Sequence, residues 1–585
     1  MVLPCAMLVV NVLSWLRWGI DLPFLDDWRA YNEQRSTSLA WSRLFEATNN
    51  TVAPVGLALD ALAQRWLGGN PLPYQTLSML ATLGGLLLLQ WRLLGWALRQ
   101  PLWQALAFAC TFFMLQSGSY WGEQNLAYHQ ALPLLGLMGA AVLGLTVSGV
   151  TLGRNMGVFA LGLLASLSYI SGAAGALVMG GAWCALARVL RSADLRQRSM
   201  HSGLALALAG CMGLVLQIGL TRQPGADRLG QSMPLTWPHE WDFWWFMAGK
   251  LGRASGHAFA QTALEVAWVF VLAMMLVCAA VVSLRGLWNG CARAWRVALV
   301  WLPMLAVILV YLGLVSLGRA GLHDASVQGA EAVFRYGYAR FHFFWVTLLW
   351  PWLAACLAIT WRRPSMLMLG LFTLCFMSMG TIRGVFNISD YYRDASIFRV
   401  GELRCITRQL GSGKPVQCPG FDAVNMLDFR RAYLHGRSVN ASFVRYLPLV
   451  EREGFGTPIF RFEGLSDEWR QVKKMDDGWL KGQGDAQLTV RPLGVENCTV
   501  VGVRIVMQAG QDGIAQLFYR KQGMADFNEL HSVSKRYAAG SVTLEFVLEN
   551  TSGFEPDLRF DPLSGFGRFR LDELEVTCLM PEALP

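Results

Sequence analysis

Long apolar stretches recur along the first two thirds of the chain, between residues 2 and 385, and then stop. Hydrophobic residues make up 54% of the 585 residues and charged residues only 15%. A helix needs roughly 20 mainly apolar residues to cross a bilayer. We therefore predict a multi-span α-helical membrane domain of about 11 transmembrane helices, with spans near residues 2–20, 74–92, 101–117, 130–149, 156–171, 172–190, 202–220, 262–284, 297–317, 341–361 and 366–385. The fifth and sixth are either two short crossings that meet at Ser171-Gly172 or one long kinked helix.

The basic residues predict the orientation of these spans. If the N-terminus is cytoplasmic, every short basic loop falls on the same side, which is expected because cytoplasmic loops retain Lys and Arg. Residues 21–73, 118–129, 221–261, 318–340 and everything after 386 are then periplasmic or extracellular. We expect a multi-pass protein of the bacterial inner (cytoplasmic) membrane, with segment 2–20 as a retained anchor. The net charge of +9 then mainly reflects the basic residues of the cytoplasmic loops, which set the orientation of the spans. The basic and aromatic residues are not interleaved as they are in nucleic-acid-binding surfaces, so we expect no nucleic-acid partner.

A second, exported part is predicted after the last span. We divide the chain into a membrane domain at 1–386, an exported α/β connector at 387–460 and a β-sandwich at 461–585. Short β-forming runs separated by turn residues carry the sandwich prediction; they lie at 486–491, 499–507, 514–519, 541–548, 558–560 and 567–577. Four cysteines lie in this exported part, and of their three possible pairings the simplest is Cys405–Cys418 with Cys498–Cys578.

Two adjacent carboxylates, Asp26 and Asp27, follow the first predicted span within the sequence Phe-Leu-Asp-Asp-Trp. Charged groups are costly beside a membrane, so such acids suggest a function. The alternative is the polar end of a helix. In the same exported loop, residues 54–67 carry apolar residues at helical spacing and predict an amphipathic helix at the interface.

Two further exported loops carry groups capable of acid-base or metal chemistry. Glu123, Asn125 and His129 offer an acid, an amide and a switchable base, and we assign them an auxiliary role. His239 and Glu240 precede an aromatic cluster that stacks on sugars or anchors a helix at the headgroups. A divalent cation is compatible with these residues, but no ligand spacing requires one.

The fourth exported loop departs from the rule that Arg stays cytoplasmic. Its notable residues are Arg319, Arg335, Tyr336 and Arg340. Guanidinium groups bind phosphate with paired hydrogen bonds, so this cluster suits a lipid phosphate. The alternative is an ion pair with Asp324 or Glu331. A carboxylate acting as general base, together with arginines that stabilise a departing polyprenyl phosphate, describes transfer from a lipid-linked donor.

An acidic pair after the first span, many spans and an exported C-terminal domain resemble the C-superfamily integral-membrane glycosyltransferases (GT-C), which include protein mannosyltransferases and aminoarabinose transferases. Residues 121–125 (Trp-Gly-Glu-Gln-Asn) and Arg335-Tyr336 are similar to recurring features of uncharacterised bacterial members. The resemblance implies that a sugar moves from a polyprenyl-phosphate donor to an exported glycan, lipid or protein acceptor, with Asp26 or Asp27 as the base. It leaves open the sugar, the stereochemistry and the metal requirement.

The C-terminal part resembles jelly-roll carbohydrate-binding modules in residues 516–520 and 558–562. A shared fold does not establish a shared function. The alternatives to a transferase are a non-catalytic membrane protein that exports or anchors surface polysaccharide, with this domain as its glycan-binding part, and a scaffold for envelope assembly.

Overall fold

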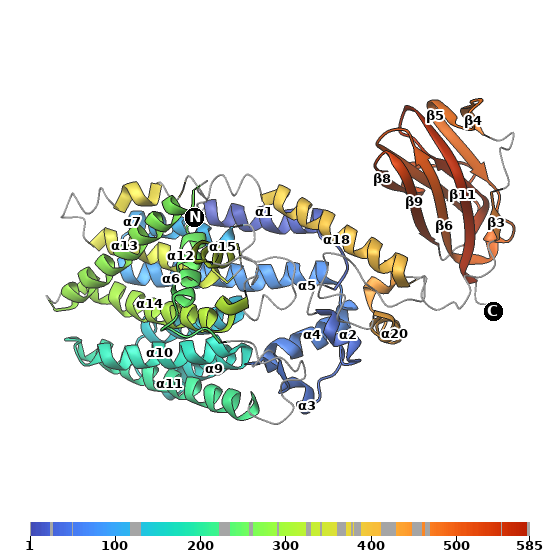
Figure 1. The fold of residues 1–585 in the computed structure, drawn as a ribbon. Helices are drawn as coiled ribbons and strands as arrows, with labels where there is room; N and C mark the ends of the chain where they lie inside the picture. The colour runs from blue at the N-terminus through green and yellow to red at the C-terminus, as the bar shows by residue number, and fades with distance from the viewer. Residues whose placement is uncertain are drawn as a thin grey trace. The chain divides into compact units, whose positions relative to one another are not determined.

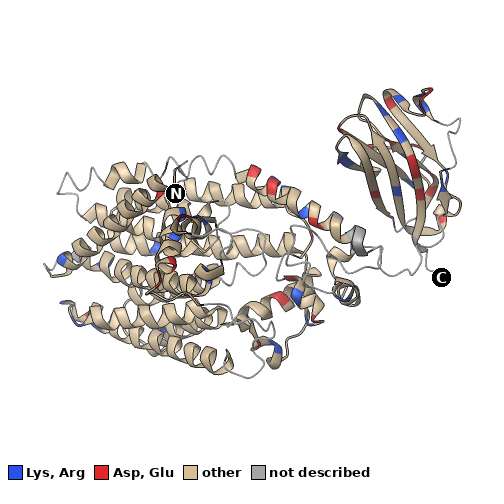
Figure 2. Cartoon of the chain, viewed as in Figure 1, with Lys and Arg blue, Asp and Glu red and all other residues tan. Residues whose placement is uncertain are grey.

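The computed structural model divides the chain into two compact units, one of residues 1–406 and 416–443, the other of residues 407–415 and 444–585 (Figure 1). It describes residues 2–23, 27–48, 51–116, 130–221, 235–256, 261–288, 292–322, 329–339, 342–359, 370–375, 378, 388–410, 429–446, 459–462, 469–550 and 553–581. Figure 2 shows few charged residues along the helices of the first unit and many of both signs on the strands of the second.

The first unit is a bundle of apolar helices, as expected of a membrane protein. Five helices are long and apolar enough to cross a bilayer: Pro71–Leu98 (α5, η1 and α6), Ile170–Ala187 (α10), Ala193–Thr221 (α11), Thr262–Trp288 (α13) and Ala294–Leu322 (most of α14, Ala292–Arg319, with η5, Ala320–Leu322). Shorter apolar helices cover Val2–Trp18 (α1), Pro101–Leu115 (α7 and η2), Leu132–Thr146 (α8 and η4), Leu152–Ser168 (α9) and Phe344–Ile359 (η6 and α16). Each of the first ten predicted spans overlaps one of these helices, but only five have the length of a full crossing. Most of the eleventh, 366–385, lies outside the described residues.

The apolar stretch between 152 and 187 forms two helices. Tyr169, with φ −167° and ψ 158°, is extended backbone between α9 and α10. The break therefore falls two residues before the predicted Ser171. Helices α10 and α11 then pack closely through glycines: a Cβ at Gly180 would lie 2.6 Å from the backbone nitrogen of Ala207. Small residues allow this approach between membrane helices, where packing replaces the hydrophobic effect as the driving force.

The first loop predicted to be exported, residues 21–73, contains the predicted amphipathic helix as α4 (Pro54–Leu67). A proline at its first position suits a helix start, because that residue needs no N–H donor. The loop also holds α2 (Asp27–Asn32), α3 (Trp41–Leu44) and a two-residue strand pair, β1 (Ala47–Thr48) with β2 (Thr51–Val52). Asn70 caps the next helix, since its side chain accepts a hydrogen bond from the backbone N–H of Leu72.

Much of the region predicted as a connector packs with the helices of the first unit. It forms α18 (Ile388–Leu410), α20 (Phe429–Ser438) and η7 (Ser442–Tyr446). Figure 1 shows α18 running beside α1, and α20 beside α2. Amphipathic helix α12 (Trp241–Ala254) packs on α15 (Ala330–Ala339) in another part of the same unit.

The second unit is a nearly closed sheet of antiparallel strands. Its order is β8-β7-β10-β5-β11-β6-β9, with β4 added beside β5 and β3 beside β11, and β8 approaches β9 to narrow the opening. The strands are β3 (Phe460–Arg461), β4 (Arg470–Lys474), β5 (Leu480–Val490), β6 (Cys498–Ala509), β7 (Gly513–Lys521), β8 (Ser532–Tyr537), β9 (Gly540–Glu549), β10 (Phe554–Asp561) and β11 (Phe566–Pro581). All six predicted strands are present.

Strand β5 joins the two faces of this unit. Its first residues, 480–483, pair with β11, whereas residues 488–490 pair with β10. Gly484 lies between them with φ +118°, a conformation that side chains with a Cβ rarely adopt. Inward residues such as Leu488, Ile505 and Phe569 form the core between the faces. Cys498 and Cys578 form the predicted disulfide between β6 and β11. Cys405 is also disulfide-bonded, while Cys418 lies outside the described residues.

Candidate functional site

The loop after α1 places two carboxylates in buried positions. Asp21, three residues after the end of α1, is 1% exposed and accepts a hydrogen bond of 2.7 Å from the Ser442 hydroxyl. Asp27 is the first residue of α2 and is 8% exposed. Asp26 lies outside the described residues. Of the predicted pair, Asp27 is therefore the acid whose surroundings are known.

Tyr31 lies within electrostatic range of three acids, Asp21, Asp27 and Asp60, which we call the acidic cluster. Burial raises the pKa of Tyr31, and the negative charges of Asp27, Asp21 and Asp60 raise it further. Electrostatic effects of this kind act over several ångströms, so all three carboxylates lie in the same region as this phenol. The Tyr31 hydroxyl donates a hydrogen bond to the side-chain oxygen of Gln64 on α4. The cluster thus joins α2 and α4 at the end of α1.

Backbone geometry after α4 supports the cluster. The helix ends at Leu67, and Gly68 adopts the left-handed conformation that caps many helices. Gly69, with φ +70°, follows, and a Cβ on this residue would run into the Tyr31 hydroxyl and the Gln64 oxygen. The Gly68 carbonyl also accepts a 2.8 Å hydrogen bond from the backbone N–H of Ser442. Ser442 therefore links the loop after α4 to Asp21.

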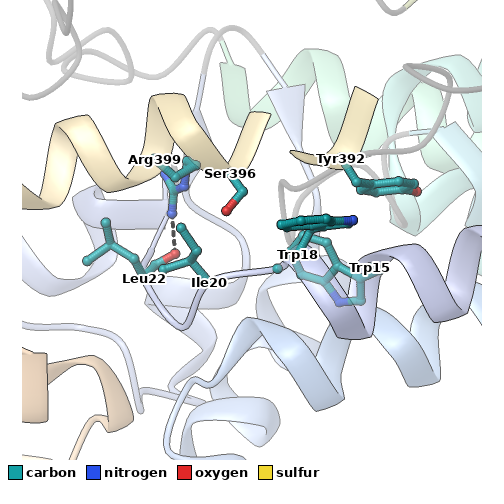
Figure 3. Close-up of a pocket in the computed structure, with 8 residues that line it drawn as sticks. Trp15, Trp18, Ile20, Leu22, Tyr392, Ser396 and Arg399 are labelled. Atoms are coloured by element: carbon teal, nitrogen blue, oxygen red, sulfur yellow. Dashed lines mark hydrogen bonds between the residues drawn. The ribbon is translucent and has the colours of Figure 1, made fainter. Parts of the chain in front are cut away.

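Arg399 on α18 holds the other side of the same loop. Its guanidinium donates to the carbonyl oxygens of Leu22 and Pro23, the latter at 2.8 Å. It also forms a 2.8 Å ion pair with Glu402. Burial raises the pKa of Glu402, and the charge of Arg399 opposes this effect. Figure 3 shows Arg399 reaching Leu22 beside a pocket between α1 and α18.

His435 on α20 completes the contacts around the cluster. Its Nε2 lies 2.9 Å from the hydroxyl of Ser36, and its ring lies 6.4 Å from that of Tyr31. Burial lowers the pKa of His435 from its ordinary value of 6.5. The folded protein therefore takes up this proton less readily than the unfolded chain does.

That lowered pKa of His435 predicts a loss of stability in acid. Above about pH 6.5 the histidine is neutral in both states, and its contribution is fully present; as the pH falls below this value, the unfolded chain binds the proton first. We expect the melting temperature of the detergent-solubilised protein to fall from about pH 7.5 to about pH 5.5, and to fall less in His435→Gln. His201→Gln, at an exposed position on α11, is the matched control and should behave like wild type. Equal pH dependence in wild type and His435→Gln would contradict this prediction.

The arginines predicted to bind phosphate lie in a different part of the unit. Arg335 on α15 forms an ion pair of 2.5 Å with Glu265 and donates a 2.8 Å hydrogen bond to the Thr262 hydroxyl. The partner is thus neither of the two acids named as alternatives, although Thr262 itself donates to Glu331. Tyr336 packs on Phe246, with ring centroids 5.8 Å apart. Arg319 is the last residue of α14, and Arg340 lies outside the described residues.

The ion pair of Arg335 predicts the cost of removing it. Glu265 is only 2% exposed, so Arg335→Gln would leave a buried carboxylate without its guanidinium. We expect a loss of about 1–3 kcal/mol in the free energy of unfolding. Arg335→Gln combined with Glu265→Gln should regain most of it, because both charges are then removed. Thermal unfolding in detergent measures both variants, and a double variant no more stable than the single one would contradict a structural role.

Helix α12 carries a buried cation, Lys250, and a half-buried one, Arg253, neither of which was selected from the sequence. Lys250 is fully buried and lies 5.0 Å from the centre of the Phe246 ring. Arg253, one turn further, lies 4.5 Å from the Phe343 ring and donates a 3.0 Å hydrogen bond to Gln116. Burial lowers the pKa of Arg253. In the sequence, the three-residue spacing of Lys250 and Arg253 indicates that both lie on one face of the helix that contains the aromatic cluster.

The residues before α12 are exposed. The Glu240 carboxylate accepts a 2.6 Å hydrogen bond from the backbone N–H of Trp237, which stabilises the local turn. His239 is solvent-exposed. Within the described ranges, no group of three or more His, Cys, Asp and Glu side chains is placed to hold a metal ion. Glu123, Asn125 and His129 lie outside those ranges.

The structure brings together Asp27 with two acids that the sequence analysis did not select, Asp21 and Asp60. Asp60 accepts a 3.2 Å hydrogen bond from the Tyr74 hydroxyl. Both had a signal in the sequence: Asp21 directly follows an apolar span, and Asp60 interrupts the apolar residues of the predicted amphipathic helix. Figure 1 shows α15, with Arg335 and Tyr336, beside α12 and away from α2, α4 and α20.

The two segments that suggested a carbohydrate-binding domain lie on neighbouring strands. Tyr519 of β7 pairs with Leu558 of β10, and Leu517 pairs with Phe560. Arg559 extends from this pair over the Phe518 ring at 4.6 Å. Residues far apart in the sequence thus form one continuous strip of sheet.

Neither a protein-family model nor a curated protein matches this chain. Among solved structures, that of "BiXyn10A CBM1 APO" is similar to part of it, at 9% sequence identity and a TM-score of 0.17. The match covers 20% of this chain and 97% of that one.

Proposed function

We propose that this membrane protein is a glycosyltransferase that moves a sugar from a polyprenyl-phosphate donor to an exported glycan, lipid or protein acceptor. The observation that carries the proposal is the burial of Asp21 and Asp27 after the end of α1, both within electrostatic range of Tyr31 together with the half-buried Asp60 of α4. Buried carboxylates beside an apolar bundle are costly, and such groups are common where acid-base chemistry takes place.

In the proposed reaction, Asp27 accepts the proton of an acceptor hydroxyl. The acceptor oxygen bonds to the anomeric carbon of the sugar, the bond from that carbon to the phosphate oxygen breaks, and polyprenyl phosphate leaves with the electron pair. Asp21 and Asp60 add negative charge in the same region, near Tyr31. Asp26 shares the proposed role because it directly precedes Asp27.

The departing phosphate needs positive charge, and the proposal gives this role to residues of α12, α14 and α15; since α15 lies away from α2 and α4, the proposal requires the two regions to come together around the donor. Arg319, Arg335, Tyr336 and Arg340 are the residues selected from the sequence, and Lys250 and Arg253 add charge near α15. The side chain of Arg335 is 39% exposed, so it keeps a solvent-facing edge while paired with Glu265. Glu123, Asn125, His129, His239 and Glu240 stay in auxiliary roles. In this proposal the acids face outward from a bacterial inner membrane, and the C-terminal jelly-roll-like domain holds a glycan.

The test uses the purified full-length chain in proteoliposomes with a panel of polyprenyl-phosphate hexoses and pentoses. Release of polyprenyl phosphate, followed by chromatography in the presence of envelope glycans as acceptors, should occur with at least one donor. Asp26→Asn with Asp27→Asn should abolish it, whereas the matched control Asp394→Asn, at a 69% exposed side chain on α18, should not. Release that survives the double substitution in a correctly inserted protein rejects the assignment. Binding of the carrier without any release would instead favour a non-catalytic export or anchoring role.

A further inference from the structure

A row of basic residues crosses three neighbouring strands of the second unit. Lys473 of β4 pairs with Lys481 of β5, and Lys481 pairs in turn with Arg568 of β11. Residues directly opposite each other in antiparallel strands point to the same face of the sheet. All three residues are exposed, and we call them the basic row. Adjacent strands lie about 4.8 Å apart, so the three cations follow one another over roughly 10 Å. Figure 2 shows Lys and Arg on adjacent strands of this unit.

The basic row is unfavourable for the sheet itself, because like charges placed directly opposite each other are destabilising. Within the described ranges, none of its three side chains takes part in an ion pair. Two acids close to the row in the chain have other partners. Asp572 pairs with Arg570 at 2.9 Å, and the Asp477 carboxylate accepts a 3.0 Å hydrogen bond from the backbone N–H of Trp479. The row therefore offers its positive charge to an anion from outside the chain.

Aromatic side chains lie beside the basic row. Arg568 lies 5.2 Å from the centre of the Trp479 ring, which holds the guanidinium near the surface of the sheet. Phe566 precedes Arg568 by two positions and so lies on the same face of β11. It is 74% exposed, and it pairs with the exposed Gln483 of β5. A free ring, an amide and a line of cations match the apolar face, the hydroxyl groups and the carboxylate of an acidic sugar.

The surroundings of the row favour a sugar polymer over a membrane or a nucleic acid. In the described part of the second unit, the large apolar side chains that are exposed are Leu493, Leu530 and Phe566. The first two lie in the segments before β6 and β8, so Phe566 alone lies beside the row. Binding to a membrane surface needs an apolar face as well as positive charge. Binding of a single-stranded nucleic acid uses several rings on which successive bases stack.

We propose that the basic row is a binding site for an acidic polysaccharide that carries uronate groups. The inference rests on the proposed function for the glycan-holding role of this unit, but binding itself does not require sugar transfer. Carboxylates of the polymer lie along Lys473, Lys481 and Arg568, and Phe566 packs against the apolar face of one sugar ring. The site thus selects the glycan by its negative charge.

The test measures binding by the full-length protein in nanodiscs of neutral phosphatidylcholine. The probes are polygalacturonate, alginate and hyaluronate, each immobilised on a biosensor surface. The methyl ester of each polymer is the matched ligand, because it keeps the sugar chain and loses the charge. We expect at least one polyuronate to bind at about 0.05 M salt and to bind at least about 10-fold more weakly at about 0.5 M salt. Its ester should bind at least about 10-fold more weakly than the acid form.

Substitutions separate the basic row from the net charge of the chain. Lys481→Gln with Arg568→Gln should weaken binding at least about 10-fold, the loss expected for charge-assisted contacts. The matched control is Lys521→Gln with Arg536→Gln on β7 and β8, which removes the same charge elsewhere in the unit and should bind like wild type. Phe566→Leu keeps an apolar side chain without a ring and should weaken binding about 3- to 10-fold.

Thermal unfolding without ligand shows whether weaker binding comes from a damaged sheet. Lys481→Gln with Arg568→Gln removes repulsion between adjacent strands, so the melting temperature of the C-terminal unit should be unchanged or slightly raised. A lowered melting temperature would show that these cations stabilise the sheet, which contradicts the proposal.

Four binding results would also overturn the proposal. These are no binding of any polyuronate, equal binding of the esters, equal loss in the two double variants, and tighter binding of phosphatidylglycerol vesicles or single-stranded DNA to the row than of any polyuronate. Sugar transfer by a protein that binds no polyuronate would reject this site and keep the transferase. Binding that depends on the row, in a protein with no transfer activity, would reject the transferase and leave this site standing.

Discussion

Asp27→Asn is expected to lower the rate of sugar transfer by a factor of about 100 to 10,000, the range that general bases contribute. Asparagine keeps the size of the side chain and removes its ability to accept a proton. Asp27 is buried, with 8% exposed, but asparagine has nearly the same size and keeps one acceptor oxygen, so the substitution should leave the start of α2 intact. The measurement is kcat for polyprenyl phosphate release, with KM for the donor nearly unchanged.

Single substitutions at the neighbouring acids separate the base from its surroundings. Asp60→Asn removes a charge from the cluster but leaves Asp27, so we expect a smaller loss of kcat and a shift in its pH profile. Asp26→Asn tests the adjacent acid in the same way. If Asp27→Asn retains full activity while Asp26→Asn loses it, the base is Asp26. Full activity in both would remove the acidic pair from the mechanism.

The second large effect concerns the disulfide between Cys498 and Cys578. It joins residues 80 positions apart, so it restricts a long loop of the unfolded chain. Replacing both cysteines by Ala should lower the free energy of unfolding of the C-terminal unit by roughly 2–5 kcal/mol. Thermal unfolding of the full-length protein, with limited proteolysis to report on the β-strands, measures this change.

A reducing agent should destabilise the wild-type protein more than the double Ala variant, since the disulfide of Cys405 is reduced in both and that of Cys498 and Cys578 only in the wild type. Cys211→Ala, at an exposed free cysteine on α11, is the matched control. A double variant that melts like wild type would show that the sheet and its core hold the unit without this bond.

The helical spans could be located from the sequence because apolar composition alone identifies them. Their lengths could not, since several apolar runs end in π- or 3-10 turns or in breaks such as that at Tyr169. These depend on packing between helices. Strands β4 and β8 were missed for another reason: they are polar, with residues such as Arg470, Lys473 and Lys535. Both lie at the edge of a sheet, where charged side chains are common.

The candidate site was predictable only in part. A pair of acids after the first span drew attention to Asp27, but its neighbour Asp60 lies more than 30 positions away on α4, and their shared contact with Tyr31 is a property of the folded loop. The partner of Arg335 was expected within its own loop, yet Glu265 on α13 takes that place. Where a helix packs on an earlier helix, residues far apart in the sequence come into contact, so neighbours in the sequence do not identify the ion-pair partner of a side chain.

The hydrogen bonds from Arg399 and Ser442 to the loop after α1 have a consequence for biosynthesis. The acids of that loop leave the ribosome first, whereas the residues that hold them emerge roughly 400 positions later. During synthesis the loop must therefore wait, without its partners, while every intervening apolar helix inserts. A chain cut short before α18 would reach the membrane with its helices in place and its acidic cluster unassembled.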